Sequence, residues 1–278
     1  MDAVLKEQLI ERMLEVGAYD VKIADPRQGF EHLNEPERHP LSIMPDCKSA
    51  ISFVIPRSGI IDLWYIGYRR SKPQEPDYWT ERQMSQADAQ FFIVHRLLLL
   101  ITSFIMLKAI AFLDRNGYKA IEKHEKEDLP LTPDKLIAYE AGLGVYGKSG
   151  LILHPELGNR IALGSILTDA ELPPDEKLVD FHPCSECDLC IQTCPAGAFG
   201  STGQYHLNWS EEKCFSTRNA LKMRGTYCNA CWGICPYGKY DDDELFFMNL
   251  QMNKHVRELQ RWVGNTLQKR AELASIRK

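Results

Sequence analysis

A chain of 278 residues suits one large or two ordinary domains, and it can bury a core without disulfide staples. Its formal net charge of −5 argues against wholesale binding to nucleic acid. The most apolar run, residues 97–107, is too short to span a bilayer, and the N-terminus is acidic and amphipathic rather than signal-like. These features predict a buried helix at 97–107, no membrane segment and a soluble, reducing, cytoplasmic setting.

The first third of the chain mixes helical and strand patterns. Apolar residues recur at helical spacing near the N-terminus, and Gly17 supplies a stop for that helix. The expected elements are a helix over 3–16, a strand over 19–24, an irregular, proline-rich loop over 25–46 and a strand over 50–55. The aromatic loop over 57–80 either walls a flat ligand or packs on the core.

The middle of the chain continues the alternation of helices and strands. A long helix is expected to end near Asn116-Gly117, and Pro155-Glu-Leu-Gly158-Asn indicates a hairpin. The expected elements are helices over 81–115 and 135–141 and strands over 118–122, 151–154 and 160–168, the last two forming that hairpin. Residues 171–183 have the composition of a linker.

Eight of the nine cysteines lie in two blocks and one position between them. The first block has the spacing C-x2-C-x2-C-x3-C-P that bacterial ferredoxins use for [4Fe–4S] clusters, and the second repeats its last three cysteines. The cysteines are Cys184, Cys187, Cys190 and Cys194, then Cys214, then Cys228, Cys231 and Cys235. Eight thiolates are the number that two cubane clusters require.

Disulfides and structural zinc both fit the cysteine pattern less well than clusters do. Disulfides are disfavoured because no secretory signal precedes the blocks. Structural zinc accounts for the C-x2-C pairs but not for a proline-ended spacing that occurs almost twice. Cys47, the ninth cysteine, precedes an apolar strand and is expected to be a buried, inert thiol.

The cysteine that precedes proline in two-cluster ferredoxins ligates the other cluster. This exchange predicts a first cluster on Cys184, Cys187, Cys190 and Cys235, and a second on Cys194, Cys214, Cys228 and Cys231. The exchange would fasten the two loops together, so cluster binding is expected to be part of folding.

The segment Gly142-Leu-Gly-Val-Tyr-Gly147-Lys148-Ser149 matches the phosphate-binding pattern G-x4-G-K-S. That chemistry needs a strand before the loop and a helix after it, whereas here a helix-like segment leads in and a strand-like one leads out. Nucleotide hydrolysis is therefore disfavoured. Glycines also let a backbone approach a large flat ligand, which is the use we expect here.

Taken together, these motifs resemble the epoxyqueuosine reductases and the related corrinoid-dependent reductive dehalogenases. The matching pieces are Ala141-Gly-Leu-Gly-x-x-Gly-Lys148, Leu151-Ile-Leu, Leu163-Gly-x-Ile-Leu-x-Asp169 and the two cysteine blocks with Cys214. The resemblance implies an α+β fold: an α/β N-terminal domain of nitroreductase-like or cobalamin-processing type, a ferredoxin-like module with two [4Fe–4S] clusters and a C-terminal helix. The expected domains are 1–175, 176–240 and 241–278.

The resemblance also implies a function and its cofactors. Members pass electrons from a ferredoxin-like module to cobalamin, whose low-valent cobalt reduces an epoxide or a carbon–halogen bond of a small-molecule substrate. Carried over to this chain, the positions beside the corrin would be Gly142, Gly144, Gly147, Lys148, Leu163, Gly164 and Ser165. A ferredoxin or flavodoxin is the electron donor that this scheme implies.

A proton donor is also part of the family's chemistry. Counting thirteen residues back from Ala141 places Asp128 at the position of the aspartate used by epoxyqueuosine reductases, although its surroundings, Glu125-Lys-Glu-Asp-Leu-Pro130, differ from the family's Asp-Ser-Ala-Pro. Some dehalogenases use a tyrosine instead, and Tyr68 and Tyr78, together with Tyr65, are the candidates here. An acid at Asp128 would need a pKa raised by burial beside the cofactor.

Two features set the chain apart from epoxyqueuosine reductases. It stops about forty residues after Cys235, without the helical-repeat region that helps those enzymes hold transfer RNA, so a tRNA substrate is not expected. Residues 252–278 hold seven Lys or Arg against two Glu, which fits a helix packed on the body or a docking face for a partner. The rival function is a two-cluster electron-transfer or activator protein whose N-terminal domain binds a partner or another cofactor, such as a flavin.

Overall fold

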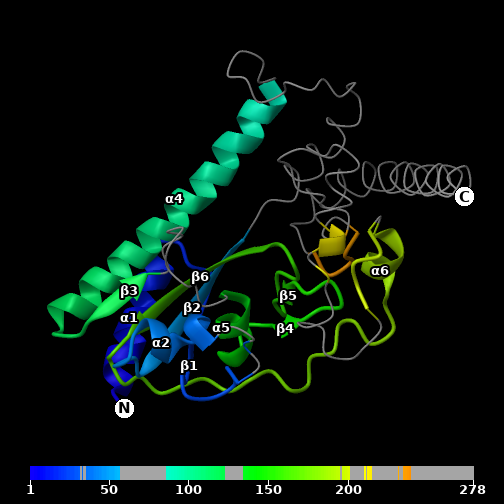
Figure 1. Cartoon of the computed structure of the whole chain (residues 1–278). Helices are drawn as coiled ribbons and strands as arrows, with labels where there is room; N and C mark the ends of the chain where they lie inside the picture. The colour runs from blue at the N-terminus through cyan, green and yellow to red at the C-terminus, as the bar shows by residue number, and fades with distance from the viewer. Residues whose placement is uncertain are drawn as a thin grey trace, which may run out of the picture. The chain divides into compact units, whose positions relative to one another are not determined.

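A four-stranded antiparallel sheet forms the framework of the N-terminal part of the chain (Figure 1). Its strands, in spatial order, are β1 (Asp20–Ala24), β2 (Ser49–Pro56), β6 (Ile161–Thr168) and β3 (Ala120–Glu122). The central strand β2 is buried from Ser49 to Ile55, which explains why its sequence is a nearly continuous apolar run. The strands near 19–24, 50–55, 118–122 and 160–168 are thus confirmed, with small shifts in their ends.

The computed structural model describes residues 1–31, 33, 36–56, 86–122, 134–194, 196–200, 210, 212–214, 231 and 234–238, with the backbone alone for 86–99. The chain divides into two compact units. The sheet unit comprises Met1–Arg57, His95–Val145 and Ile152–His182, and the cysteine unit comprises Ser58–Val94, Tyr146–Leu151 and Pro183–Lys278.

Helices α1 (Ala3–Glu15) and α4 (Gln86–Arg115) supply the main core on one face of the sheet. The side chain of Asp2 caps α1 by accepting a hydrogen bond of 2.8 Å from the backbone N–H of Leu5. Four-residue spacing then brings three buried α1 side chains into line with buried residues of α4 and β2. These core residues are Leu5, Leu9 and Met13 of α1, Ile105, Ala109 and Leu113 of α4, and Ile51 and Phe53 of β2.

The two helix stops expected from glycine are present. Gly17 follows α1 at φ +114°, and Gly117 follows α4 at φ +84°, conformations that side-chain-bearing residues rarely adopt. The apolar run 97–107 lies inside α4, but its residues are only partly buried: Ile105 is 0% exposed, whereas Leu100 is 65% exposed. Of the helices in the described ranges, none has the length and hydropathy needed to cross a membrane.

Helix α5 (Asp134–Glu140) packs against strands β1, β2 and β6. It buries Leu136, Ile137 and Ala138, residues outside the α1–α4 core, and it corresponds to the helix expected over 135–141. Because successive strand side chains alternate between faces, Ser52 of β2 and its register partner Ser165 of β6 lie opposite the face that holds Phe53. Both faces of the sheet are therefore covered, as expected for a mixed α and β fold.

Two expectations for the loops were wrong. The segment 25–46 is not wholly irregular, because it contains the short helices η1 (Pro36–Arg38) and α2 (Pro40–Ile43). Proline can begin such helices, and the His39 ring accepts a hydrogen bond from the N–H of Leu41 at the start of α2. Proline content therefore indicated helix starts here rather than an absence of helix.

The hairpin expected between 151–154 and 160–168 does not form. The short strand β5 (Ile152–Leu153) pairs with β4 (Val145–Tyr146), while β6 lies between β2 and β3. His154 and Gly158 do close a tight loop through two backbone hydrogen bonds of 2.8 Å, so the turn signal was correct. The long β6 then finds more partners in the sheet than a two-residue β5 could offer.

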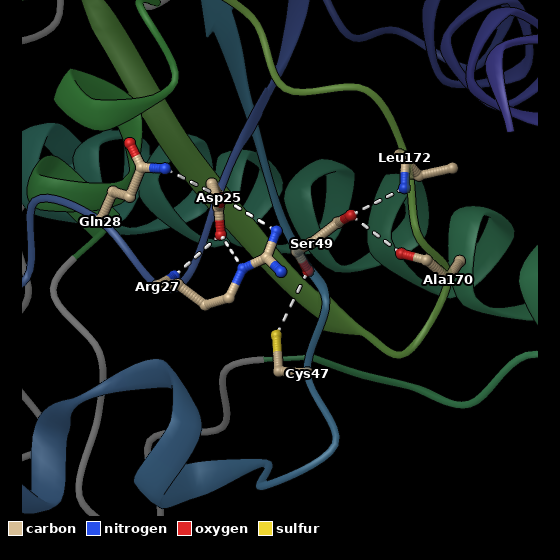
Figure 2. A network of polar contacts seen from close by, with 7 residues as sticks. All are labelled: Asp25, Arg27, Gln28, Cys47, Ser49, Ala170 and Leu172. Atoms are coloured by element: carbon tan, nitrogen blue, oxygen red, sulfur yellow. Dashed lines mark hydrogen bonds and ion pairs between the residues drawn. The ribbon is translucent and has the colours of Figure 1, made fainter. Parts of the chain in front are cut away.

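The segment that follows β6, residues 170–177, is held tightly against the sheet unit and is called the exit segment here. The hydroxyl of Ser49 donates to the carbonyl of Ala170 at 2.8 Å and accepts from the N–H of Leu172 at 3.0 Å (Figure 2). Asp175 accepts hydrogen bonds of 2.8 Å from the Lys6 ammonium and from the N–H of Ile23. The supposed linker thus begins as an ordered part of the sheet unit.

Candidate functional site

The first cysteine block is built from a turn followed by a short helix. The N–H of Cys187 donates to the carbonyl of Cys184, and α6 (Leu189–Thr193) begins directly after Asp188. Cys190 lies in the first turn of α6 and Cys194 caps its C-terminal end. The four thiols are partly buried, so they are shielded from bulk water without being enclosed in the core.

Cys190 lies among three other cysteines that the sequence assigned to the same cluster. Burial raises the pKa of the Cys190 thiol to about 11, and the nearby thiols of Cys184, Cys235 and Cys187 raise it further. Cys235 belongs to the second cysteine block, so its position near Cys190 brings the two blocks together. This is the neighbourhood that the predicted exchange of ligands requires.

The chemistry of this donor set fits an iron–sulfur cluster. Four adjacent thiolates repel one another in a partly buried site, and a cationic metal core relieves that repulsion. The eight described cysteines are all free, which disfavours the disulfide alternative for them. In the described residues no three His, Cys, Asp or Glu side chains already stand in metal-binding geometry, and coordination would have to draw the thiols inward.

The second cysteine set is linked by a short chain of hydrogen bonds. The N–H of Ala198 donates to the sulfur of Cys194 at 3.5 Å, and the carbonyl of Ala198 accepts from the N–H of Ser210 at 2.8 Å. The carbonyl of Ser210 in turn accepts from the N–H of Cys214 at 3.1 Å. Cys231 is partly buried, and Cys228 lies outside the described residues, so this ligand set stays a prediction.

Cys47 is separate from the cysteine unit and matches its expected state. Its side chain is buried in the sheet unit, where its Sγ donates to the carbonyl of Ser49 (Figure 2). Burial raises the pKa of the Cys47 thiol to about 11, so the reactive thiolate is scarce at neutral pH. The prediction of a buried thiol is confirmed.

The glycines expected to face a corrin are accounted for by packing within the sheet unit. A Cβ on Gly142, which has φ +77°, would lie 2.1 Å from the carbonyl oxygen of Glu176 in the exit segment. A Cβ on Gly144 would lie 2.5 Å from the carbonyl oxygen of Leu153, and one on Gly164 would lie 2.3 Å from the ring of Phe53. These glycines therefore fit close chain packing, and their missing side chains leave no open cradle for a flat ligand.

The other positions predicted beside the corrin differ from one another in their surroundings. Leu163 is partly buried, whereas Ser165 is buried and its hydroxyl has no hydrogen-bond partner among the described residues. Gly147 donates its N–H to the carbonyl of Leu151 at 2.8 Å and is part of a tight turn. Lys148, in that turn, donates its backbone N–H to the sulfur of Cys184.

The order of elements around this segment also supports the exclusion of a phosphate-binding loop. Helix α5 ends at Glu140, before the glycines, and the short strand β5 begins at Ile152, after them. A phosphate-binding loop would have the strand first and the helix second. The proposed proton donors Asp128, Tyr68 and Tyr78 lie outside the described residues, as does Tyr65.

Sequence reasoning missed the hydrogen bonds from Lys148 to Cys184 and from Ala198 to Cys194. Backbone donors leave no residue-type signal, so spacing between cysteines does not reveal them. The one local sign was glycine: Gly150 and Gly197 have φ of +68° and +54°, and each lies within three residues of a donor.

Comparison with known proteins gives a consistent relationship. The chain is 30% identical over 128 residues to the epoxyqueuosine reductase of Staphylococcus aureus, a match that covers 42% of this chain and 32% of that protein. The chain thus spans about a third of the length of the curated relatives that head the comparison. No protein-family model matches the chain.

Solved structures extend the likeness in fold over most of the chain. An epoxyqueuosine reductase bound to an epoxyqueuosine-modified tRNA-Tyr stem loop has a TM-score of 0.53 at 19% identity, over 86% of this chain and 66% of that one. A reductive dehalogenase whose structure suggested a mechanism for B12-dependent dehalogenation has a TM-score of 0.64 at 18% identity, over 94% of this chain and 35% of that one. The resemblance expected from the motifs is confirmed: this chain is a sequence relative of epoxyqueuosine reductases, and its fold is similar to theirs and to that of corrinoid reductive dehalogenases.

Proposed function

We propose that this chain is an iron–sulfur, corrinoid-dependent oxidoreductase that reduces an epoxide or carbon–halogen bond in a small organic substrate. The observation that carries the proposal is the gathering of Cys184, Cys187 and Cys235 around Cys190. Cysteines from two separate blocks meet there, as two-cluster ferredoxins require. The relationship to epoxyqueuosine reductases then supplies the reaction class.

The residues of the chain have distinct tasks in this proposal. Cys184, Cys187, Cys190 and Cys235 hold one [4Fe–4S] cluster, and Cys194, Cys214, Cys228 and Cys231 hold the other. When bound, the clusters supply one-electron transfer and the corrinoid supplies a strongly reducing metal centre. The partly buried thiols limit the access of water to the cluster that they hold, and burial is one of the means by which a protein sets its potential.

The partners follow from the same reasoning. A ferredoxin or flavodoxin delivers single electrons of low enough potential and is the donor that we propose. One related enzyme was solved with an epoxyqueuosine-modified tRNA stem loop, which makes that stem loop the first substrate to test here. The net charge of −5 favours a small substrate over a large RNA surface.

A second function is favoured by the packing of the glycines. Because Gly142, Gly144 and Gly164 lie against the protein's own atoms, their backbone does not offer the expected approach to a corrin. A two-cluster electron-transfer or activator protein needs no corrin, and its N-terminal domain would bind a partner or another cofactor. Cobalt separates the two functions.

The test of the reductase is corrinoid binding under anaerobic conditions. The purified chain is mixed with hydroxocobalamin, freed of excess corrinoid and reduced while absorption and EPR spectra are recorded. The reductase predicts about one corrinoid per chain that becomes reduced through the clusters. Iron without bound corrinoid, or a bound corrinoid that stays oxidised, would contradict it and support the carrier.

Asp128 is the residue that we propose as the proton donor. Replacing it with asparagine removes the acid but keeps the size of the side chain, and turnover of the epoxyqueuosine stem loop should fall by at least about 100-fold. Single-turnover assays with the loaded protein measure this effect. Glu127→Gln, which changes a carboxylate in the same segment, is the matched control, and unchanged turnover in Asp128→Asn would exclude Asp128 as the acid.

A further inference from the structure

Three cysteine sulfurs of the cysteine unit accept hydrogen bonds from backbone N–H groups. Cys190 accepts from Ile191 and Cys194 accepts from Ala198, both donors close in sequence. Cys184 differs, because its donor is Lys148, which precedes it by more than thirty residues. A distant donor means that the fold brings the Gly147-Lys148-Ser149-Gly150 turn to the first cysteine of the block.

The turn is built to present the amide of Lys148. The N–H of Gly147 donates to the carbonyl of Leu151, and the N–H of Gly150 donates to the carbonyl of Gly147, both at 2.8 Å. Gly150 has φ +68°, which favours glycine at the position where the turn closes. Tyr146–Leu151 groups with the cysteine unit, although the residues directly before and after it group with the sheet unit.

Lys148 acts on Cys184 in two ways. Its backbone N–H donates a hydrogen bond to the sulfur, and its ammonium group lies close enough for its charge to favour the thiolate. Burial and the neighbouring Cys187 act in the opposite direction and raise the pKa of Cys184. Lys148 therefore offsets part of the cost of placing negative charge at this sulfur.

The same electrostatics apply to a cluster bound through Cys184. An iron–sulfur cluster gains one negative charge when it is reduced, and hydrogen bonds and cations near its sulfurs stabilise that charge. A nearby ammonium group thus favours the reduced form over the oxidised form. Removing the charge should make the cluster harder to reduce.

We propose that Lys148 is a positioning residue for the iron–sulfur cluster of Cys184, holding that cysteine through its amide and raising the cluster's reduction potential through its charge. The proposal rests on the proposed function only in requiring a cluster at Cys184. It gives the Gly-Lys-Ser-Gly turn a role in electron transfer, distinct from phosphate binding and from contact with a corrin. The balanced step is the uptake of one electron by the cluster, supplied in the test by a low-potential chemical reductant.

The test is a redox titration of the anaerobically reconstituted protein, followed by EPR. Lys148→Met removes the charge but keeps the backbone N–H. At a fixed solution potential, it should lower the ratio of reduced to oxidised cluster about tenfold, which equals a shift of about −59 mV for one electron. Lys148→Arg should restore the wild-type ratio to within about twofold, since it keeps the charge. The second cluster should keep its potential in both variants.

Lys119→Met is the matched control, because Lys119 is a surface lysine of the sheet unit that pairs with Asp46. It should leave both potentials unchanged. Iron and sulfide analysis of every variant shows whether the clusters are present. Full cluster content with an unchanged potential in Lys148→Met would overturn the role of Lys148 alone, whereas a wild-type chain that binds no cluster would overturn the proposed function as well.

Discussion

Replacing Cys190 with alanine is expected to remove one of the two iron–sulfur clusters. The thiols of Cys184, Cys187 and Cys235 surround Cys190, and a [4Fe–4S] cluster needs four thiolates. Iron should fall from about eight to about four per chain, or lower if the exchanged ligands couple the two sites. Iron and sulfide analysis after anaerobic reconstitution measures the loss, and far-ultraviolet circular dichroism should show that the sheet unit remains folded.

Cys47→Ala provides the matched control for this loss. Cys47 is a buried thiol of the sheet unit and has no part in the predicted ligand sets. The variant should keep its full iron content, although the small cavity left in the core should lower stability slightly. A Cys190→Ala protein that still binds eight irons would contradict the assignment of Cys190 as a ligand.

Replacing Lys177 with methionine is expected to destabilise the sheet unit by about 3 kcal/mol, since it leaves the buried carboxylate of Glu140 without its cation. The Lys177 ammonium pairs with that carboxylate, whose side chain is only 5% exposed. Glu140 also packs directly against Gly29, where a Cβ would overlap its carboxylate. Lys177 lies 5.4 Å from the centroid of the Tyr139 ring, and this cation–π contact is lost as well.

Urea unfolding followed by circular dichroism measures this change as a lower midpoint. Lys119→Met is again the control, because its ion pair with Asp46 is exposed on both sides and spans 3.0 Å. Exposed pairs are screened by water and contribute little, so the control midpoint should stay close to that of the wild type. Equal midpoints for the two variants would show that Glu140 tolerates the loss of its partner and that the exit segment is held by its other hydrogen bonds.

Local patterns predicted the elements of the sheet unit well. Leu5, Leu9 and Met13 repeat at four-residue spacing, and their burial in α1 follows from that periodicity. Val4 was expected on the same face but is 64% exposed, because a helix presents adjacent residues in directions about 100° apart. Strand β2 was recognisable because a strand buried on both faces carries apolar residues at nearly every position.

Pairing between distant elements was harder to predict from sequence. The tight loop from His154 to Gly158 has the composition of a hairpin turn, yet β6 pairs with β2 and β3 rather than with β5. Which strand pairs with which depends on the number of hydrogen bonds and the apolar area available across the whole sheet. Turn residues alone carry no information on that competition.

The same division between local and distant information applies to the site. Cysteine spacing predicted that Cys184, Cys187 and Cys190 would gather, because two-residue gaps fit one turn and one short helix. Adding Cys235 needed knowledge of how ferredoxin loops exchange ligands. The amide of Lys148 was not predictable at all, since every residue type except proline offers the same backbone donor.

Metal analysis of the wild-type chain tests the central claim most directly. The protein is purified without oxygen, reconstituted with iron and sulfide, and examined by elemental analysis and by EPR after reduction. The proposed function predicts about eight irons and eight inorganic sulfides per chain, with the signals of two neighbouring [4Fe–4S] clusters. Zinc bound in place of iron, or a chain that holds no cluster at all, would contradict it.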